Sequence, residues 1–92
     1  MQITFDNEQE YDSIWGAVHD AILYWKKVRQ AAQGKICLHP DGSDTHYSEK
    51  YAVGMIVQYA KMLKSLEDSQ GAEYYSVIIT QALKLDTAEV AA

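Results

Sequence analysis

The strongest constraint on this chain is a run of apolar residues spaced by three and four between residues 7 and 33. The run comprises Tyr11, Ile14, Val18, Ala21, Trp25, Val28 and Ala32. This spacing is typical of an amphipathic helix that packs against another helix. Asp6 with Gln9, or Asn7 with Glu10, has the spacing of a capping box, and Gly34 is a residue type that commonly ends helices. The sequence therefore predicts one long helix over 7–33, against which the rest of the chain packs.

Two further segments are predicted to be helical. Residues 48–66 carry apolar residues at the same spacing, and residues 72–85 carry a shorter stripe. The latter segment is rich in β-branched and aromatic residues at 74–80, so a strand is the alternative there. We expect a single all-α domain over 1–92, a small antiparallel bundle of two long helices and a shorter third helix. A frayed tail is expected at 86–92.

The segment between the two long helices has the chemistry of a turn. Pro40 presets the backbone angle φ, and Gly42 accepts positive φ. The flanking residues can pair as a short β-hairpin within 35–47, whereas an ordered loop over 34–47 is the simpler interpretation. An α+β fold that uses strands from this segment and the N-terminus is the fallback for the fold class.

Four residues of this segment form a candidate metal site. A hairpin would place Cys37, His39, Asp44 and His46 on one face, and one thiolate, two imidazoles and a carboxylate suit tetrahedral zinc. The spacing matches no standard zinc motif, and a polar surface loop is the competing interpretation. A lone cysteine in an apolar-rich chain is also typical of an inert core residue. We therefore predict no cofactor, no catalytic residue and no enzymatic activity, and keep the metal site as an alternative.

Net charge limits the classes of partner. The 92 residues carry a formal charge of −5, which argues against general binding to nucleic acids or anionic membranes. No apolar run reaches the roughly 18 residues of a membrane-spanning helix, so we expect a cytoplasmic protein. Along the first predicted helix the acidic residues precede the basic ones, an order that complements the helix dipole.

The aromatic content points to an interface. Seven tyrosines and two tryptophans are more than one small helical core can bury, and both residue types are enriched at binding hot spots. We predict an acidic protein-interaction module, a homo-oligomer (a dimer), of the kind that phages and mobile elements use to bind and block a host protein. The predicted partner-binding residues are Glu8, Glu10, Tyr11, Asp12, Trp15 and Tyr24.

A small-ligand or nucleotide site is the alternative function. Aromatic rings stack on bases and basic side chains hold phosphates. The residues suited to this role are Tyr24, Trp25, Lys26, Lys27 and Arg29.

Two glycines lie inside the predicted long helices. Gly16 and Gly54 each lower local helix propensity by about 1 kcal/mol relative to alanine. A close approach of another backbone is the structural reason that we expect for them.

Overall fold

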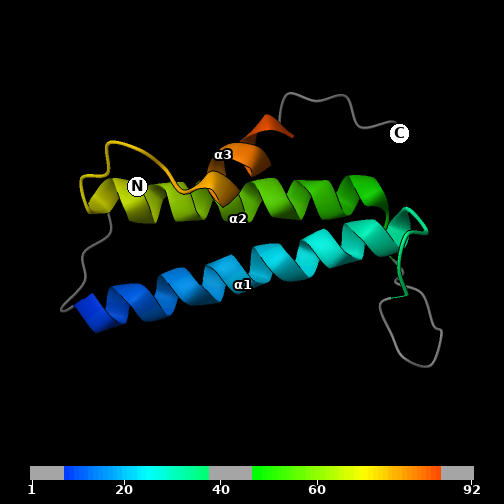
Figure 1. The fold of residues 1–92 in the computed structure, drawn as a ribbon, viewed down its shortest axis with the longest axis horizontal. Coiled ribbons are helices and arrows are strands. Elements are labelled where there is room, and N and C mark those ends of the chain that lie inside the picture. The colour runs from blue at the N-terminus through cyan, green and yellow to red at the C-terminus, as the bar shows by residue number, and fades with distance from the viewer. Residues whose placement is uncertain (1–7, 38–46, 86–92) are drawn as a thin grey trace.

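The computed structural model describes residues 8–37 and 47–85, and these residues form three α-helices (Figure 1). Helix α1 spans Glu8–Ala32, α2 spans Glu49–Ser69 and α3 spans Val77–Lys84. No strand occurs within the described ranges, so the all-α prediction is confirmed for them. The predicted hairpin is not shown, because residues 38–46 lie outside the described residues.

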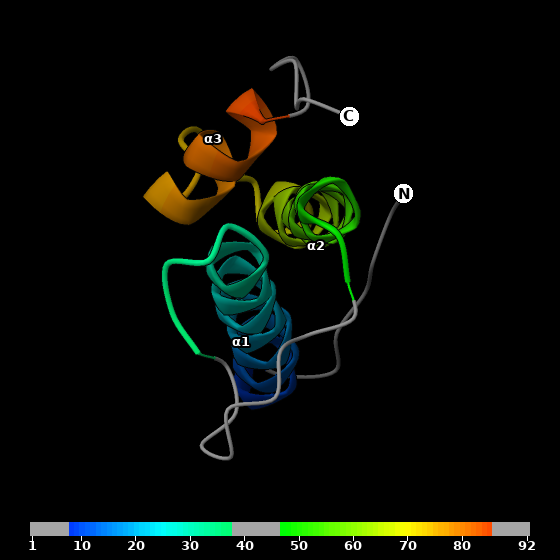
Figure 2. The same ribbon diagram turned by 90° about the vertical axis from the view of Figure 1, so that its right-hand side faces the viewer.

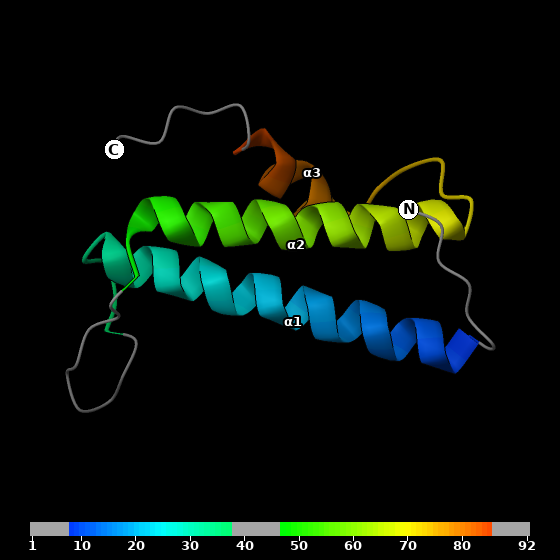
Figure 3. The same cartoon turned by 180° about the vertical axis from the view of Figure 1, so that it is seen from behind.

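Helices α1 and α2 form an antiparallel hairpin and lie side by side over most of their lengths (Figures 1 and 3). Of the predicted α1 stripe, Val18 and Val28 are buried, whereas Ile14 and Ala32 are exposed. Val28 of α1 and Ala52 and Leu63 of α2 are completely buried. No described helix has the combination of length and apolar character needed to cross a bilayer.

Glycines end both long helices. Gly34 and Gly71 have φ of 76° and 73°, a left-handed conformation that glycine adopts without steric cost. After α1, Lys35 N–H donates to the Gln30 carbonyl at 2.9 Å. After α2, Ala72 N–H donates to the Glu67 carbonyl at 3.2 Å, so both ends have the Schellman pattern.

Helix α2 is longer than the predicted 48–66, because it runs on to Ser69. Its start agrees with the sequence, since the Ser48 hydroxyl caps it by accepting from Tyr51 N–H at 3.1 Å. At the other end Glu67 is buried rather than part of a solvent-facing break. The helix therefore continues past residue 66 to Ser69, and the chain turns away at Gly71.

Helix α3 begins at Val77, later than the predicted start at residue 72. The strand alternative for 74–80 is wrong, because residues 77–80 are helical. Ile79 and Ala82 are buried, whereas Val77 is exposed. Helix α3 crosses α2 and rises away from it toward its C-terminal end (Figures 1 and 3).

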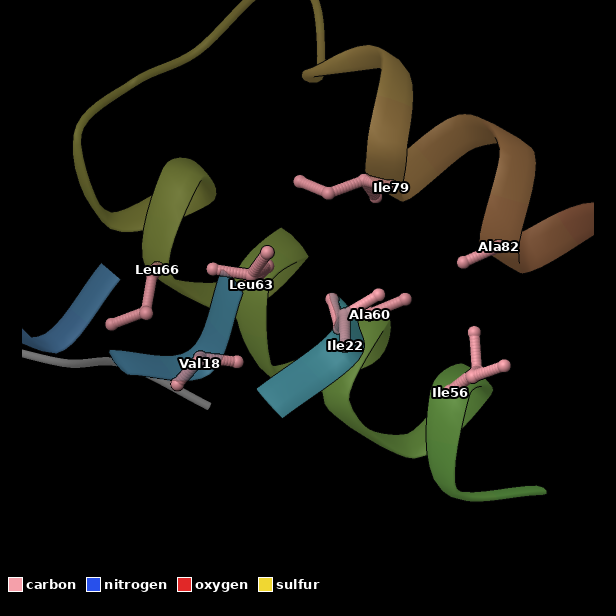
Figure 4. Close-up of a cluster of buried hydrophobic side chains, with 8 residues drawn as sticks. All are labelled: Val18, Ile22, Ile56, Ala60, Leu63, Leu66, Ile79 and Ala82. Atoms are coloured by element: carbon pink, nitrogen blue, oxygen red, sulfur yellow. The ribbon is translucent and has the colours of Figure 1, made fainter. Parts of the chain in front are cut away.

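Side chains from all three helices meet in one core (Figure 4). The core cluster comprises Val18 and Ile22 of α1, Ile56, Ala60, Leu63 and Leu66 of α2, and Ile79 and Ala82 of α3. Seen along the bundle, α1 and α3 both lie beside α2 (Figure 2). Helix α2 is thus the central element of the described fold.

The glycines inside the long helices have open surroundings. A Cβ atom added at Gly16 or Gly54 would meet no atom within 4 Å. Within residues 8–37 and 47–85, no backbone approaches either glycine closely, so the expected reason for them is not found there.

Candidate functional site

A buried carboxylate joins the three helices. Glu67 of α2 is only 8% exposed and accepts a hydrogen bond from Trp15 Nε1 of α1 at 3.0 Å. It also accepts from the backbone N–H and the hydroxyl of Ser76, at 3.1 and 2.5 Å. Since Ser76 directly precedes α3, these bonds fix where that helix begins. The side chain of His19 stacks on Trp15, with ring centroids 5.0 Å apart.

The surroundings of Glu67 also affect Tyr11. Burial raises the pKa of the Tyr11 hydroxyl above its ordinary value, and the nearby charges of Glu67 and Asp12 raise it further. The Glu67 oxygens are already engaged by Trp15 and Ser76. This arrangement supports a structural role, in which the carboxylate holds α3 against the α1–α2 hairpin.

A cavity of about 240 Å3 lies between α1 and α3, with α2 at its base. The lining residues are Ile22, Lys26 and Arg29 of α1, Ile56 of α2, and Ile78, Gln81, Ala82 and Leu85 of α3 or its end. We call this space the α1–α3 cavity.

The polar residues of the α1–α3 cavity are mostly basic. Lys26 and Arg29 contribute positive charge, and Gln81 contributes a neutral amide. Arg29 Nε lies 3.5 Å from Glu49 Oε1, which also accepts from Gln33 Nε2 at 2.9 Å. Arg29 Nε is enclosed and makes no hydrogen bond within the described part of the chain. The cavity therefore combines an apolar lining with two cationic side chains.

A second feature is a cluster of aromatic rings from α1 and the start of α2. The ring centroid of Trp25 lies 5.5 Å from Tyr24, 5.0 Å from Tyr47 and 5.6 Å from Tyr51. Tyr47 and Tyr51 stack with an interplanar angle of 11°. The three tyrosines are 45–51% exposed, so this cluster presents aromatic surface to solvent.

Three more large apolar side chains are exposed on α1 and α2, and of these Leu23 of α1, 40% exposed, lies about half a turn from Ile14 and so on another side of the helix. Ile14 is 39% exposed and Met62 is 40% exposed. At about 100° per residue, Ile14 lies roughly a quarter turn around α1 from the residues that face α3 or the cavity. Met62 lies more than a quarter turn around α2 from Glu67 by the same geometry. We call Ile14, Tyr24, Tyr47, Tyr51 and Met62 the hairpin face.

Charge is unevenly distributed along the hairpin. Because α1 and α2 are antiparallel, the acidic start of α1 lies at the same end as Asp68 and Glu73. Residues 8–20 and 61–76 contain seven acidic and two basic residues. Residues 21–37 and 47–60 contain five basic residues and one acidic residue. The described part of the bundle thus has an acidic end and a basic end.

The predicted partner-binding residues are found in different environments. Tyr11 and Trp15 are partly buried and pack against the core, whereas Glu10 and Asp12 are exposed. The side chain of Glu8 lies outside the described structure. Tyr24 is 49% exposed and belongs to the hairpin face, where the sequence argument did not include Tyr47 or Tyr51. Helical periodicity could not have paired them, because Tyr47 precedes the N-cap residue Ser48 and lies outside α2.

The predicted nucleotide-binding residues are divided between two features. Lys26 and Arg29 line the α1–α3 cavity, whereas Tyr24 and Trp25 belong to the aromatic cluster. Lys27 is exposed and does not line the cavity. The structure therefore does not bring the stacking rings and the cavity cations together.

The metal prediction falls mainly on residues that the structure does not describe. Cys37 is exposed, so the expectation of a core cysteine is wrong: the chain leaves α1 at Gly34 before reaching it. His39, Asp44 and His46 lie outside the described residues. Among the residues of 8–37 and 47–85, no group of three potential metal ligands is present.

The chain matches no family model, no curated protein sequence and no solved structure.

Proposed function

We propose that this chain is a protein-interaction module whose partner is a second copy of itself, bound through the hairpin face. The observation that carries this proposal is the exposure of five large apolar or aromatic side chains, each 39–51% exposed, on the α1–α2 hairpin. Exposed apolar surface of this kind is typical of interaction sites. Tyrosine suits such a site because it buries a large area while keeping a polar hydroxyl group.

The position of α3 explains why this face is available. Helix α3 covers one side of the hairpin through Ile79 and Ala82. With about 100° of rotation per residue, Tyr51 and Met62 lie on the side of α2 that is turned away from α3, so that the contact with α1 lies between them and α3. No described helix covers the hairpin face. Two hairpins that meet there would complete a four-helix layer, a common architecture for helical proteins.

Charge complementarity favours a second copy as the occupant. A two-fold axis near the middle of the hairpin would place the basic end of each copy beside the acidic end of the other. Such a pairing brings residues of opposite charge together on both sides of the axis. A host protein as the target of an inhibitor stays a prediction, since no described feature selects a foreign partner over a second copy.

The test is the solution mass of the chain, measured by sedimentation equilibrium over a range of protein concentrations. We expect a reversible dimer, which Tyr24→Asp and Tyr51→Asp should each weaken by at least about tenfold, because a charge is placed in an apolar contact. Tyr74→Asp is the matched control. Tyr74 is 87% exposed and lies in the segment that leads to α3, so its variant should dimerise like the parent chain.

Circular dichroism would establish that each variant keeps its helices. A monomer at every concentration would overturn the proposal, as would equal dimer affinity for Tyr24→Asp, Tyr51→Asp and the control.

A further inference from the structure

We propose that the α1–α3 cavity binds a small amphipathic carboxylate, an aliphatic chain that ends in one carboxylate group. This site is separate from the hairpin face, because none of the five residues of that face lines the cavity. The inference therefore does not depend on self-association.

The apolar part of the ligand is argued from the cavity lining. Ile22 and Ile56, whose side chains are almost completely buried, lie beneath the cavity. Ile78 and Leu85 line its α3 side. These side chains offer no hydrogen-bonding groups to a ligand. An aliphatic chain lying over the half-buried Ile78 and Leu85 would remove their exposed apolar surface, and its own, from water, which is favourable.

The carboxylate is argued from the charges beside this lining. Lys26 and Arg29 lie one helical turn apart on α1, and both line the cavity. Glu49 Oε1 lies 3.5 Å from Arg29 Nε, and that nitrogen makes no hydrogen bond among the described residues. A cation beside apolar surface is stabilised by an anion that accepts hydrogen bonds from it, and guanidinium and carboxylate groups match well in geometry.

Cavity size and lining argue against a nucleotide. The volume of about 240 Å3 lies below the roughly 300–1,000 Å3 of pockets that enclose drug-sized ligands. No aromatic ring lines the cavity, so a base would find no stacking partner among the lining residues. A short aliphatic carboxylate satisfies both the volume and the lining.

The experiment uses octanoate as the probe and the full chain in which isoleucine methyl groups are isotope-labelled for NMR. We expect octanoate, below its micelle-forming concentration, to shift the methyl signals of Ile22, Ile56 and Ile78. Octanamide has the same chain and a neutral head group. It should bind about tenfold more weakly, because it lacks the charge-assisted hydrogen bonds to Lys26 and Arg29.

Two neighbouring lysines supply matched variants. Lys26→Gln should weaken octanoate binding by about tenfold, whereas Lys27→Gln should leave it within about twofold of the parent chain. Both lysines are exposed on α1, but only Lys26 lines the cavity, so both variants are expected to fold. Ile78→Trp adds bulk inside the cavity and should abolish the methyl shifts at Ile22 and Ile56 while circular dichroism is retained.

Several outcomes would overturn the inference. They are the absence of methyl shifts at millimolar octanoate, equal affinity for octanoate and octanamide, and equal effects of the two lysine variants. Methyl shifts confined to Ile14, on the hairpin face, would place octanoate outside the cavity. Saturable shifts of the three cavity methyl groups with ATP but not with octanoate would replace the proposed class with nucleotides.

Discussion

Glu67 shows how much of this fold depends on one side chain. Its carboxylate accepts from Trp15 and from two groups of Ser76, and it lies almost wholly out of solvent. Glu67→Gln should lower the free energy of unfolding by about 1–3 kcal/mol. The neutral amide loses the charge-assisted hydrogen bonds, and its NH2 group would face the donor groups of Trp15 or Ser76. Urea denaturation measures the change. Glu73→Gln, at an exposed position, should stay within about 0.5 kcal/mol of the parent, and equal losses would refute this role for Glu67.

Asp68, the next residue, provides a pH-dependent prediction. The Tyr75 hydroxyl donates to Asp68, and Lys64 Nζ lies 3.4 Å from its other carboxylate oxygen. The bond from Tyr75 and, to a smaller extent, Lys64 lower the pKa of Asp68 below its ordinary value. A lowered folded-state pKa gives stability that is present above the unfolded pKa and is lost as pH falls through the folded value.

Removing the Tyr75 hydroxyl should reverse that effect. In Tyr75→Phe the pKa of Asp68 should rise toward its ordinary value, and stability should be lost at a higher pH during acidification. Carbon-detected NMR titration of the Asp68 carboxyl follows the change. Tyr74→Phe removes the neighbouring hydroxyl, which has no bond to Asp68 among those observed, and should leave the titration unchanged. A pKa that does not move in Tyr75→Phe would contradict the assignment.

At the scale of the elements, replacement by alanine should change stability in opposite directions at Gly16, inside α1, and at Gly34, just after it. Gly16→Ala should stabilise the chain by about 0.5–1 kcal/mol, because the helix gains propensity and the added Cβ has open space. Gly34→Ala should destabilise it by about 1 kcal/mol, because φ at Gly34 is 76°. Thermal and urea unfolding give both values. A loss of stability in Gly16→Ala would contradict this prediction, since the described residues leave open space for the added Cβ.

Helix α3 differs from the two long helices in what stabilises it. Its eight residues are too few for a stable isolated helix, so it depends on packing. Ile79 and Ala82 supply that packing, and Glu67 holds the preceding Ser76. Helix α3 is held at its start by Glu67 and rises away from α2 toward its C-terminal end (Figure 1), and its residues Ile78, Gln81 and Ala82 line the α1–α3 cavity.

At the scale of the whole molecule, the two charged ends give a charge-exchange test of the proposed dimer. Glu10 and Lys27 lie on opposite halves of α1, so a two-fold axis midway between them along the helix would bring Glu10 of each copy towards Lys27 of the other. Glu10→Lys and Lys27→Glu should each weaken dimerisation by about two- to fivefold, and the double variant should regain most of the affinity. Sedimentation at low ionic strength measures these constants, and added salt should reduce all the differences. A double variant weaker than both single variants would exclude this antiparallel pairing.

The sequence by itself was sufficient for the parts of the fold that depend on local chemistry. The three-four spacing indicated two long helices, Ser48 stood at the start of the second, and Gly34 ended the first. The order of charges along α1 was equally visible. These features could be predicted because periodicity, capping and glycine conformation involve residues within a turn or two of one another.

Only the tertiary structure decided what covers each apolar face. Periodicity indicates the direction in which a side chain points, but not whether another helix lies there, so the exposure of Tyr24 and the burial of Tyr11 could not be separated from sequence. The same limit concealed Glu67, whose hydrogen-bond donors lie 52 and 9 residues away. The start of α3 depends on that long-range carboxylate, and residues of α3 line the α1–α3 cavity. The local pattern determined the helices, whereas contacts between distant residues determined the two candidate binding sites.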